Sequence, residues 1–183
     1  MTVDIKRFIA KCESCQLNKR NEILEPTKKF ATQVEAPFTH LGLDIIGPLP
    51  ETSSENQYII VIVDYFTNWV EAQPLSTITS CDVVNFLSQI FARFGTPNTI
   101  TTDNGVQFNS DFTKIFLDLY DVYIKFTVTY HHESNGLTEN RNREIGKLLL
   151  LLASKEKEWD LVLPFALWPL RTSKNSVTKY SSF

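Results

Sequence analysis

Cysteine and long apolar runs are scarce in this chain. Three cysteines among 183 residues, an odd number, argue against a secreted disulfide scaffold and for a reducing compartment. No apolar run approaches the roughly 18 residues that a membrane span needs, and the first residues contain no signal-peptide core. The chain is nevertheless 43% hydrophobic and 12% aromatic. We therefore expect a globular fold of one domain plus short extensions.

Positive charge is also in short supply. The formal net charge is −3 and the sequence pI is about 5.6. A stand-alone DNA-binding domain is usually basic, so the charge of the whole chain argues against that class. Net charge averages over the surface, however, and a site built from carboxylates would itself contribute negative charge. If the chain acts on nucleic acid, we expect other segments to supply most of the phosphate contacts.

Apolar residues follow the periods of strands and helices along the chain. Leu41 and Leu43 alternate with Gly42 and Asp44, a period of two that places Asp44 on the face opposite the leucines. The apolar run 58–63 suits a central strand buried on both faces. The predicted segments are strands at 41–46, 58–63 and 68–73, a helix at 79–94, a strand at 99–102, a helix at 110–120, a strand at 121–128 and helices from 137 onward. This order is that of an α/β, ribonuclease H-like fold, a mixed five-stranded sheet flanked by helices.

Two of the predicted helices carry apolar stripes that indicate which face packs inward. In the first helix, Thr79 and Asp82 have the spacing of a capping box, and Gly95 and Pro97 end the helix. Its inward stripe is predicted to contain Val83, Phe86, Leu87, Ile90, Phe91 and Phe94. The inward residues of the second helix are predicted to be Phe112, Ile115, Phe116 and Leu119.

Three carboxylates stand out against this pattern. Asp103 follows a β-favouring run, and Asn104-Gly105 then turns the chain because both residues tolerate positive φ. Asp44 closes an earlier apolar run, and Glu139 follows Asp103 by 139 − 103 = 36 positions. Glu139 lies roughly 140° around its helix from the centre of the apolar stripe, so it points away from that packing. Each alone is explained by a turn or a solvated glutamate, although the strand end at Asp103 is a place where open α/β sheets tend to bind ligands.

The motifs around these carboxylates resemble the catalytic core of retroviral-type integrases, especially those of gypsy-type LTR retrotransposons. The resemblance rests on Leu43-Asp44-Ile45-Ile46-Gly47-Pro48-Leu49, on Asp103-Asn104-Gly105 with Phe108, and on Tyr130-His131 followed by Asn135-Gly136-Leu137-Thr138-Glu139. It implies that Asp44, Asp103 and Glu139 are catalytic and hold two Mg²⁺ or Mn²⁺ ions, which prefer hard oxygen ligands. It further implies 3′-end processing and strand transfer of element DNA into target DNA by in-line phosphoryl transfer.

The same resemblance implies the partners and the location of the protein. Double-stranded DNA, both element ends and target, is the expected substrate, and the chain is expected to form homo-oligomers. No membrane partner is expected. The protein is expected to act in the nucleus and to be in the cytoplasm before it is imported.

Polar residues near the third carboxylate are candidate DNA contacts. Asn142, Arg143 and Lys147 follow Glu139 by three, four and eight positions, so they share its helical face. An equally weighted alternative is ordinary surface charge, with Glu139 and Arg143 as an i,i+4 pair. Further candidates are Gln107, Tyr130 and Asn135, whereas His131 and His132 are interpreted as loop residues and Asp64 as a turn residue.

The segment before the core resembles part of a second domain. Cys12 and Cys15 form the Cys-x-x-Cys half of the family's zinc site, but no histidine precedes His40. Structural zinc needs four ligands, so we interpret this half site as incomplete and expect no zinc. The predicted division is a zinc-domain remnant at 1–20, a linker at 21–37 and the catalytic core at 38–183.

Departures from the family pattern leave alternatives open. The family usually has proline and arginine where His132 and Asn140 stand, and a proline where Ser182 stands. Pro169 is expected to kink or end the last helix. We expect this chain to be a fragment or decayed copy of a larger polyprotein, without the flanking modules of a full integrase. The alternatives are a catalytically incompetent remnant that binds nucleic acid or protein, and a general ribonuclease H-like nuclease.

Overall fold

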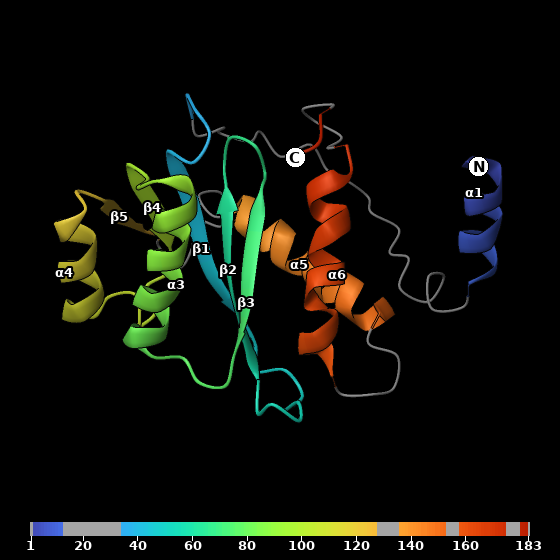
Figure 1. The fold of residues 1–183 in the computed structure, drawn as a ribbon, viewed down its shortest axis with the longest axis horizontal. Coiled ribbons are helices and arrows are strands. Elements are labelled where there is room, and N and C mark those ends of the chain that lie inside the picture. Colours follow the sequence, from blue (N-terminus) through green and yellow to red (C-terminus); the bar gives the residue numbers. More distant parts are fainter. Residues whose placement is uncertain (1, 13–33, 128–135, 153–157, 175–179, 183) are drawn as a thin grey trace.

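The computed structural model describes residues 2–12, 34–127, 136–152, 158–174 and 180–182. Its core is a five-stranded sheet with helices on both faces (Figure 1). The elements are α1 (Thr2–Lys11), β1 (His40–Ile46), β2 (Tyr58–Asp64), β3 (Val70–Leu75), α3 (Ser80–Phe94), β4 (Thr99–Thr102), α4 (Asp111–Leu119), β5 (Tyr123–Phe126), α5 (Gly136–Leu152) and α6 (Trp159–Thr172). The predicted α/β class and element order are confirmed.

The pairing of the strands puts β1 at the centre of the sheet, in the order β3-β2-β1-β4-β5. β1, β2 and β3 form an antiparallel meander, whereas β4 and β5 run parallel to β1. The β1–β4 register joins His40 to Thr99 and Gly42 to Thr101, an offset of 99 − 40 = 59 residues. The carboxyl ends of β1 and β4 therefore lie side by side, at the edge where open α/β sheets bind ligands.

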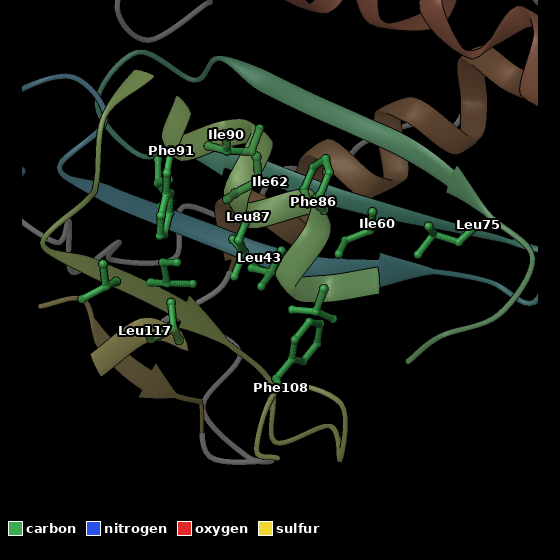
Figure 2. Close-up of a cluster of buried hydrophobic side chains, with 14 residues drawn as sticks. Leu43, Ile60, Ile62, Leu75, Phe86, Leu87, Ile90, Phe91, Phe108 and Leu117 are labelled. Atoms are coloured by element: carbon green, nitrogen blue, oxygen red, sulfur yellow. The ribbon is translucent and has the colours of Figure 1, made fainter. Parts of the chain in front are cut away.

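The sheet separates two apolar cores. α3 and α4 cover one face, and α5 and α6 cover the other (Figure 1). Strand β2 contributes to both, because Ile60 and Ile62 point to the first core while Ile59 and Val61 point to the second. The prediction that this strand is buried on both faces is confirmed. Figure 2 shows the first core, with Phe108 at its edge.

Helix α3 forms as its sequence predicts. Thr79 is the N-cap, with its side chain accepting from the Asp82 backbone N–H while the Asp82 carboxylate accepts from the Thr79 backbone N–H. Gly95 follows the helix with φ of 87°, a conformation that favours glycine. The buried face consists of Val83, Phe86, Leu87, Ile90 and Phe91, with Phe94 partly buried beside them.

Helix α4 packs on a different face from the predicted one. Three of the four residues predicted to point inward are exposed, with exposed fractions of 54% for Phe112, 68% for Ile115 and 76% for Leu119. Only Phe116 packs against the first core. The prediction of this stripe was therefore wrong for three residues.

The start of α4 explains its rotation. The Ser110 hydroxyl oxygen caps the helix by accepting from the Thr113 N–H at 3.1 Å. The Thr113 hydroxyl in turn donates to the Gln107 carbonyl at 2.8 Å. These bonds turn Thr113 and Leu117 toward the sheet, and both are buried. A polar residue at the inward position concealed this face from an analysis of apolar periodicity.

The two ends of the chain test only part of the predictions made for them. Helix α6 continues through Pro164 and Pro169 to Thr172, so Pro169 does not end it. Cys12 directly follows α1, whereas Cys15 lies outside the described residues. The zinc half site and the domain boundaries at 20 and 37 therefore stay predictions. No helix in the described ranges is both long and apolar enough to cross a membrane.

Candidate active site

The strand register brings the first two acidic residues together. Asp44 lies in β1, and Asp103 directly follows the last residue of β4. Their offset, 103 − 44 = 59, equals that of the paired residues His40 and Thr99. Continuing the parallel register therefore sets Asp103 beside Asp44 at the carboxyl edge of the sheet. The neighbours Leu41 and Leu43 point into the first core, so Asp44 faces the α5 side as predicted.

The Asp44 carboxylate is partly buried and held by two hydrogen bonds. The backbone N–H of Ile45 donates to Oδ1 at 2.8 Å, and the Asn142 amide donates to Oδ2 at 2.7 Å. The pKa of Asp44 is raised to about 6, chiefly by burial and to a smaller extent by the charges of Asp103 and Glu139, against the lowering effect of the two hydrogen bonds. The charges of Asp103 and Glu139 therefore both act on the Asp44 carboxylate.

The turn after β4 fixes Asp103. Its Oδ1 accepts from the Gly105 backbone N–H at 3.0 Å, the local bond with which aspartate stabilises a turn. The Phe108 N–H donates to the Gly105 carbonyl at 3.0 Å, and the Phe108 ring is fully buried in the first core. This ring anchors the turn from below while the Asp103 carboxylate stays exposed.

Helix α5 positions Glu139 in its first turn. Ile145 and Leu149 of the same helix are buried in the second core, where α5 packs on β1 and β2. Glu139 itself is only partly buried, on the side from which its charge acts on Asp44. Its predicted orientation, away from the apolar packing of α5, agrees with this placement.

The donor chemistry suits divalent magnesium or manganese, although the site is not preassembled. Within the described residues, no three acidic, histidine or cysteine side chains converge closely enough to hold a metal ion. Asp44, Asp103 and Glu139 nevertheless supply the hard oxygen donors that these ions prefer. Both Asp44 oxygens already accept hydrogen bonds, but each has a second lone pair for a metal.

The structure divides the candidate DNA contacts. The Asn142 side-chain amide donates to Asp44, so it holds a carboxylate of the site. Arg143 is exposed and donates to the Asn140 side-chain oxygen at 3.3 Å. Gln107 and Lys147 are partly buried. The other candidates, Tyr130 and Asn135, lie outside the described residues together with His131 and His132. DNA contact by all six candidates stays a prediction.

Asp64 is a turn residue, as interpreted from the sequence. It is 1% exposed, and its Oδ1 accepts from the Phe38 N–H at 3.0 Å. Its Oδ2 accepts from the N–H and the hydroxyl of Thr67, at 2.9 and 2.6 Å. These bonds close the turn between β2 and β3 and tie it to the segment before β1. Asp64 is not a fourth member of the acidic site.

Sequence reasoning missed the contacts that support the carboxylates. The Asn142–Asp44 bond joins residues 98 positions apart, and Tyr65 contacts Thr138 across 73 positions. Only one of these had a signal, because Asn142 follows Glu139 by three positions and shares its helical face. Gly42 lies two residues before Asp44 and contacts α5, but nothing in the local sequence indicates this contact.

The fold is that of the ribonuclease H-like class, and the family match that follows implies the polynucleotidyl transferase superfamily. The family model for the integrase core domain matches residues 34–132, and the chain belongs to that family. The matched segment contains Asp44 and Asp103 and ends before Glu139. The family resemblance inferred from the motifs is thereby confirmed.

Two curated polyproteins are similar in sequence to this chain. The chain is 36% identical over 140 residues to the Pol polyprotein of Radiation murine leukemia virus (strain Kaplan), covering 75% of this chain and 24% of the relative. It is 32% identical over 153 residues to the Transposon Tf2-3 polyprotein of Schizosaccharomyces pombe (strain 972 / ATCC 24843), covering 82% of this chain and 11% of the relative. The chain thus spans a quarter or less of the length of these relatives.

Two solved structures support the fold. A chain of the simian T-cell lymphotropic virus intasome in complex with PP2A regulatory subunit B56 gamma superposes with a TM-score of 0.75 at 22% identity, covering 100% of this chain and 65% of that chain. The HTLV-2 integrase catalytic core domain in complex with magnesium (trimeric form) gives a TM-score of 0.65 at 24% identity, covering 80% of this chain and 94% of that chain. At these identities the likeness establishes the ribonuclease H-like fold.

Proposed function

We propose that this chain is the catalytic core of an integrase that processes the 3′ ends of element DNA and joins them to target DNA. The observation that carries the proposal is the strand register that sets Asp44 and Asp103 side by side, with Glu139 close enough for its charge to act on Asp44. A pair of aspartates in register at a strand edge, with a glutamate brought to them by a helix, suits divalent-metal chemistry on phosphates. Membership in the integrase core domain family supports the same reaction class.

The three carboxylates would hold the metal ions that this reaction needs. When bound, such ions activate the attacking oxygen and stabilise the leaving oxygen of an in-line displacement. In 3′-end processing, a water oxygen bonds to phosphorus and the bond to a 3′ oxygen breaks, which leaves a free 3′-OH. In strand transfer, that 3′-OH oxygen bonds to a target phosphorus and the target 3′ oxygen leaves. Asn142 orients the Asp44 carboxylate in both steps, and no side chain serves as a nucleophile.

We further propose that DNA and other copies of this chain are its partners. Three large apolar side chains on α6, at intervals of four and three residues, support self-association: Leu161 is 67% exposed, Phe165 70% and Trp168 69%. Their alignment on one helix face gives a contiguous apolar surface suited to an identical surface on a second copy. The HTLV-2 catalytic core that shares the fold is a trimeric form by its description.

We place the action of the protein in the nucleus, where chromosomal target DNA lies, with the cytoplasm occupied before import. A tagged copy is expected to accumulate in nuclei on cell fractionation. Retention in the cytoplasm would contradict this location without bearing on the chemistry.

The test of catalysis is metal-dependent disintegration, the reverse of strand transfer, on a branched DNA. We expect activity with Mg²⁺ or Mn²⁺ in the wild type and its loss in Glu139→Gln. The control is Asp118→Asn, which changes an exposed acidic residue of α4 and should retain activity. An inactive but folded wild type would favour the non-catalytic remnant, whereas metal-dependent cutting without strand transfer would favour a nuclease. Activity that survives Glu139→Gln would show that the third carboxylate is misassigned.

A further inference from the structure

A missing side chain lets helix α5 touch the central strand. A Cβ atom built on Gly42 would overlap Thr138 Oγ1 and lie 2.5 Å from Tyr65 Cε1 and 2.8 Å from the Tyr65 hydroxyl oxygen. Real Cβ atoms do not approach other atoms this closely, so only glycine leaves room for both side chains. We name the meeting of Gly42, Tyr65 and Thr138 the Gly42 contact. It is one of the points at which α5 rests on the sheet, beside the buried packing of Ile145 and Leu149.

The Gly42 contact lies directly beneath the acidic site. Gly42 precedes Asp44 by two residues on the same face of β1, and Thr138 precedes Glu139 in α5. Thr138 is fully buried, so the helix cannot shift along the strand without displacing it. Asp44 lies two residues from Gly42 in β1, and Glu139 lies one residue from Thr138 in α5. A change in how α5 packs on Gly42 therefore changes the separation of the Asp44 and Glu139 carboxylates.

Tyr65 closes the contact from the side of β2. The Thr138 hydroxyl donates to the Tyr65 oxygen at a long distance of 3.5 Å, and the Thr101 side chain also hydrogen-bonds the tyrosine. The His40 ring stacks on the Tyr65 ring with centroids 4.7 Å apart, and His40 Nε2 lies 2.8 Å from Thr101 Oγ1. The tyrosine hydroxyl is thus held among side chains of β1, β4 and α5.

The surroundings of the Tyr65 hydroxyl agree with a place under the carboxylates. Burial raises the pKa of Tyr65, and the charges of Asp44 and Glu139 raise it further against the hydrogen bonds from Thr138 and Thr101. The hydroxyl therefore stays protonated. It lies close enough to respond to both carboxylates, yet it is bonded to neutral hydroxyl groups.

We propose that Tyr65 and Thr138 are positioning residues, which seat α5 on Gly42 and thereby set the Asp44–Glu139 separation needed to bind divalent metal. This inference rests on the proposed function, because it assigns the reason for the contact to that site. A purely structural contact would contribute stability and leave metal affinity unchanged. A positioning contact changes metal affinity in variants that retain the fold, since metal ligands must be held within about 0.5 Å of their productive geometry.

The test compares conservative pairs of variants by two readouts. Tyr65→Phe removes only the hydroxyl, Thr138→Val replaces the hydroxyl by a methyl group, and Thr138→Ser restores it. The control is Tyr58→Phe, which changes a partly buried tyrosine of β2 that packs against the first core. Mn²⁺ binding is measured by calorimetry without DNA, and the Mg²⁺ concentration for half-maximal disintegration is measured separately. Melting temperature confirms that each variant is folded.

We expect Tyr65→Phe and Thr138→Val to weaken Mn²⁺ binding by about tenfold and to raise the Mg²⁺ requirement equally, the lower end of the usual loss for residues that orient metal ligands. Thr138→Ser and Tyr58→Phe should bind as the wild type does. Gly42→Ala, where it folds, should weaken binding more than Tyr65→Phe or Thr138→Val does, and wild-type Mn²⁺ affinity in folded Gly42→Ala would contradict the proposal. Unchanged metal affinity in folded Tyr65→Phe and Thr138→Val would overturn the proposal.

The two proposals fail in distinguishable ways. A wild type that binds Mn²⁺ but catalyses no strand transfer would overturn the proposed integrase activity, while the calorimetric series would still decide the positioning roles. A wild type that binds no Mn²⁺ would overturn both. Normal wild-type catalysis with unaltered metal binding in every variant would overturn the positioning proposal alone.

Discussion

Replacing Asp44 by asparagine should stabilise the metal-free protein at neutral pH. The folded state raises the pKa of Asp44 from 3.8 to about 6, with burial as the largest cause. A group with a raised folded pKa adds stability below its unfolded pKa and loses it as the pH rises through the folded value. The loss therefore develops between pH 3.8 and about 6, and above that range the ionised carboxylate destabilises the fold. Asparagine carries no charge and escapes this cost.

The size of the effect follows from the shift. A change of about two pKa units corresponds to about 3 kcal/mol as an upper bound, and partial exposure of Asp44 reduces the expected gain to ~1–2 kcal/mol. For a chain of this length the melting temperature should rise by about 3–6 °C. The Ile45 N–H can still donate to the new amide oxygen. The Asn142 amide must turn over, so that its buried Oδ1, which has no hydrogen-bond partner among the described residues, accepts from the new NH₂ group.

The assay is thermal unfolding in a chelator at pH 7.5 and pH 5, with and without about 10 mM Mg²⁺. The gain should shrink by about half at pH 5, where folded wild-type Asp44 is mostly protonated. Mg²⁺ should stabilise the wild type and not the variant. The control is Asp118→Asn, which changes an exposed residue of α4 and should leave the melting temperature unchanged. An equal or lower melting temperature for Asp44→Asn in chelator at pH 7.5 would refute the reasoning.

Three further predictions test other parts of the molecule. Leu117→Ala should lower the free energy of unfolding by about 2–4 kcal/mol in denaturant titrations. Leu119→Ala, on the exposed side of the same helix, should lower it by less than about 0.5 kcal/mol. Equal losses would contradict the observed rotation of α4. Trp168→Glu should weaken self-association by more than about tenfold in light scattering, and an unchanged mass would remove α6 from the interface. Burial lowers the pKa of His40, so the unfolded state takes up its proton first and stability should fall as the pH drops below about 6.5. His40→Asn, compared in the Asp44→Asn background, should lose that slope.

The strands were the most predictable part of the fold. A period of two fixes the face of every residue in β1, so alternation alone places Asp44 opposite Leu41 and Leu43. The continuous apolar run of β2 likewise required burial on both faces. The Asn104-Gly105 turn then indicated where β4 had to end, which left Asp103 at the edge of the sheet.

The rotation of α4 was beyond an analysis of periodicity because polar bonds decide it. The Thr113 hydroxyl reaches the Gln107 carbonyl, so this polar residue occupies the inward face that an apolar stripe would normally mark. Leu117 then packs one helical turn later, and Phe112 and Leu119 are left in solvent. An apolar count favoured the face that is exposed, since it contains more large side chains than the buried one.

The three carboxylates differ in what holds them, and this decides how far each can be inferred. Asp44 is placed by strand alternation and Asp103 by a local turn, and both devices can be recognised within a few residues of sequence. Glu139 depends on where an entire helix rests, and this placement includes the contact of Thr138 with Gly42 and Tyr65, residues far apart in the chain. The family match likewise ends before Glu139. Metal affinity should therefore be most sensitive to changes at the seat of α5, the part of the site that the local sequence specifies least.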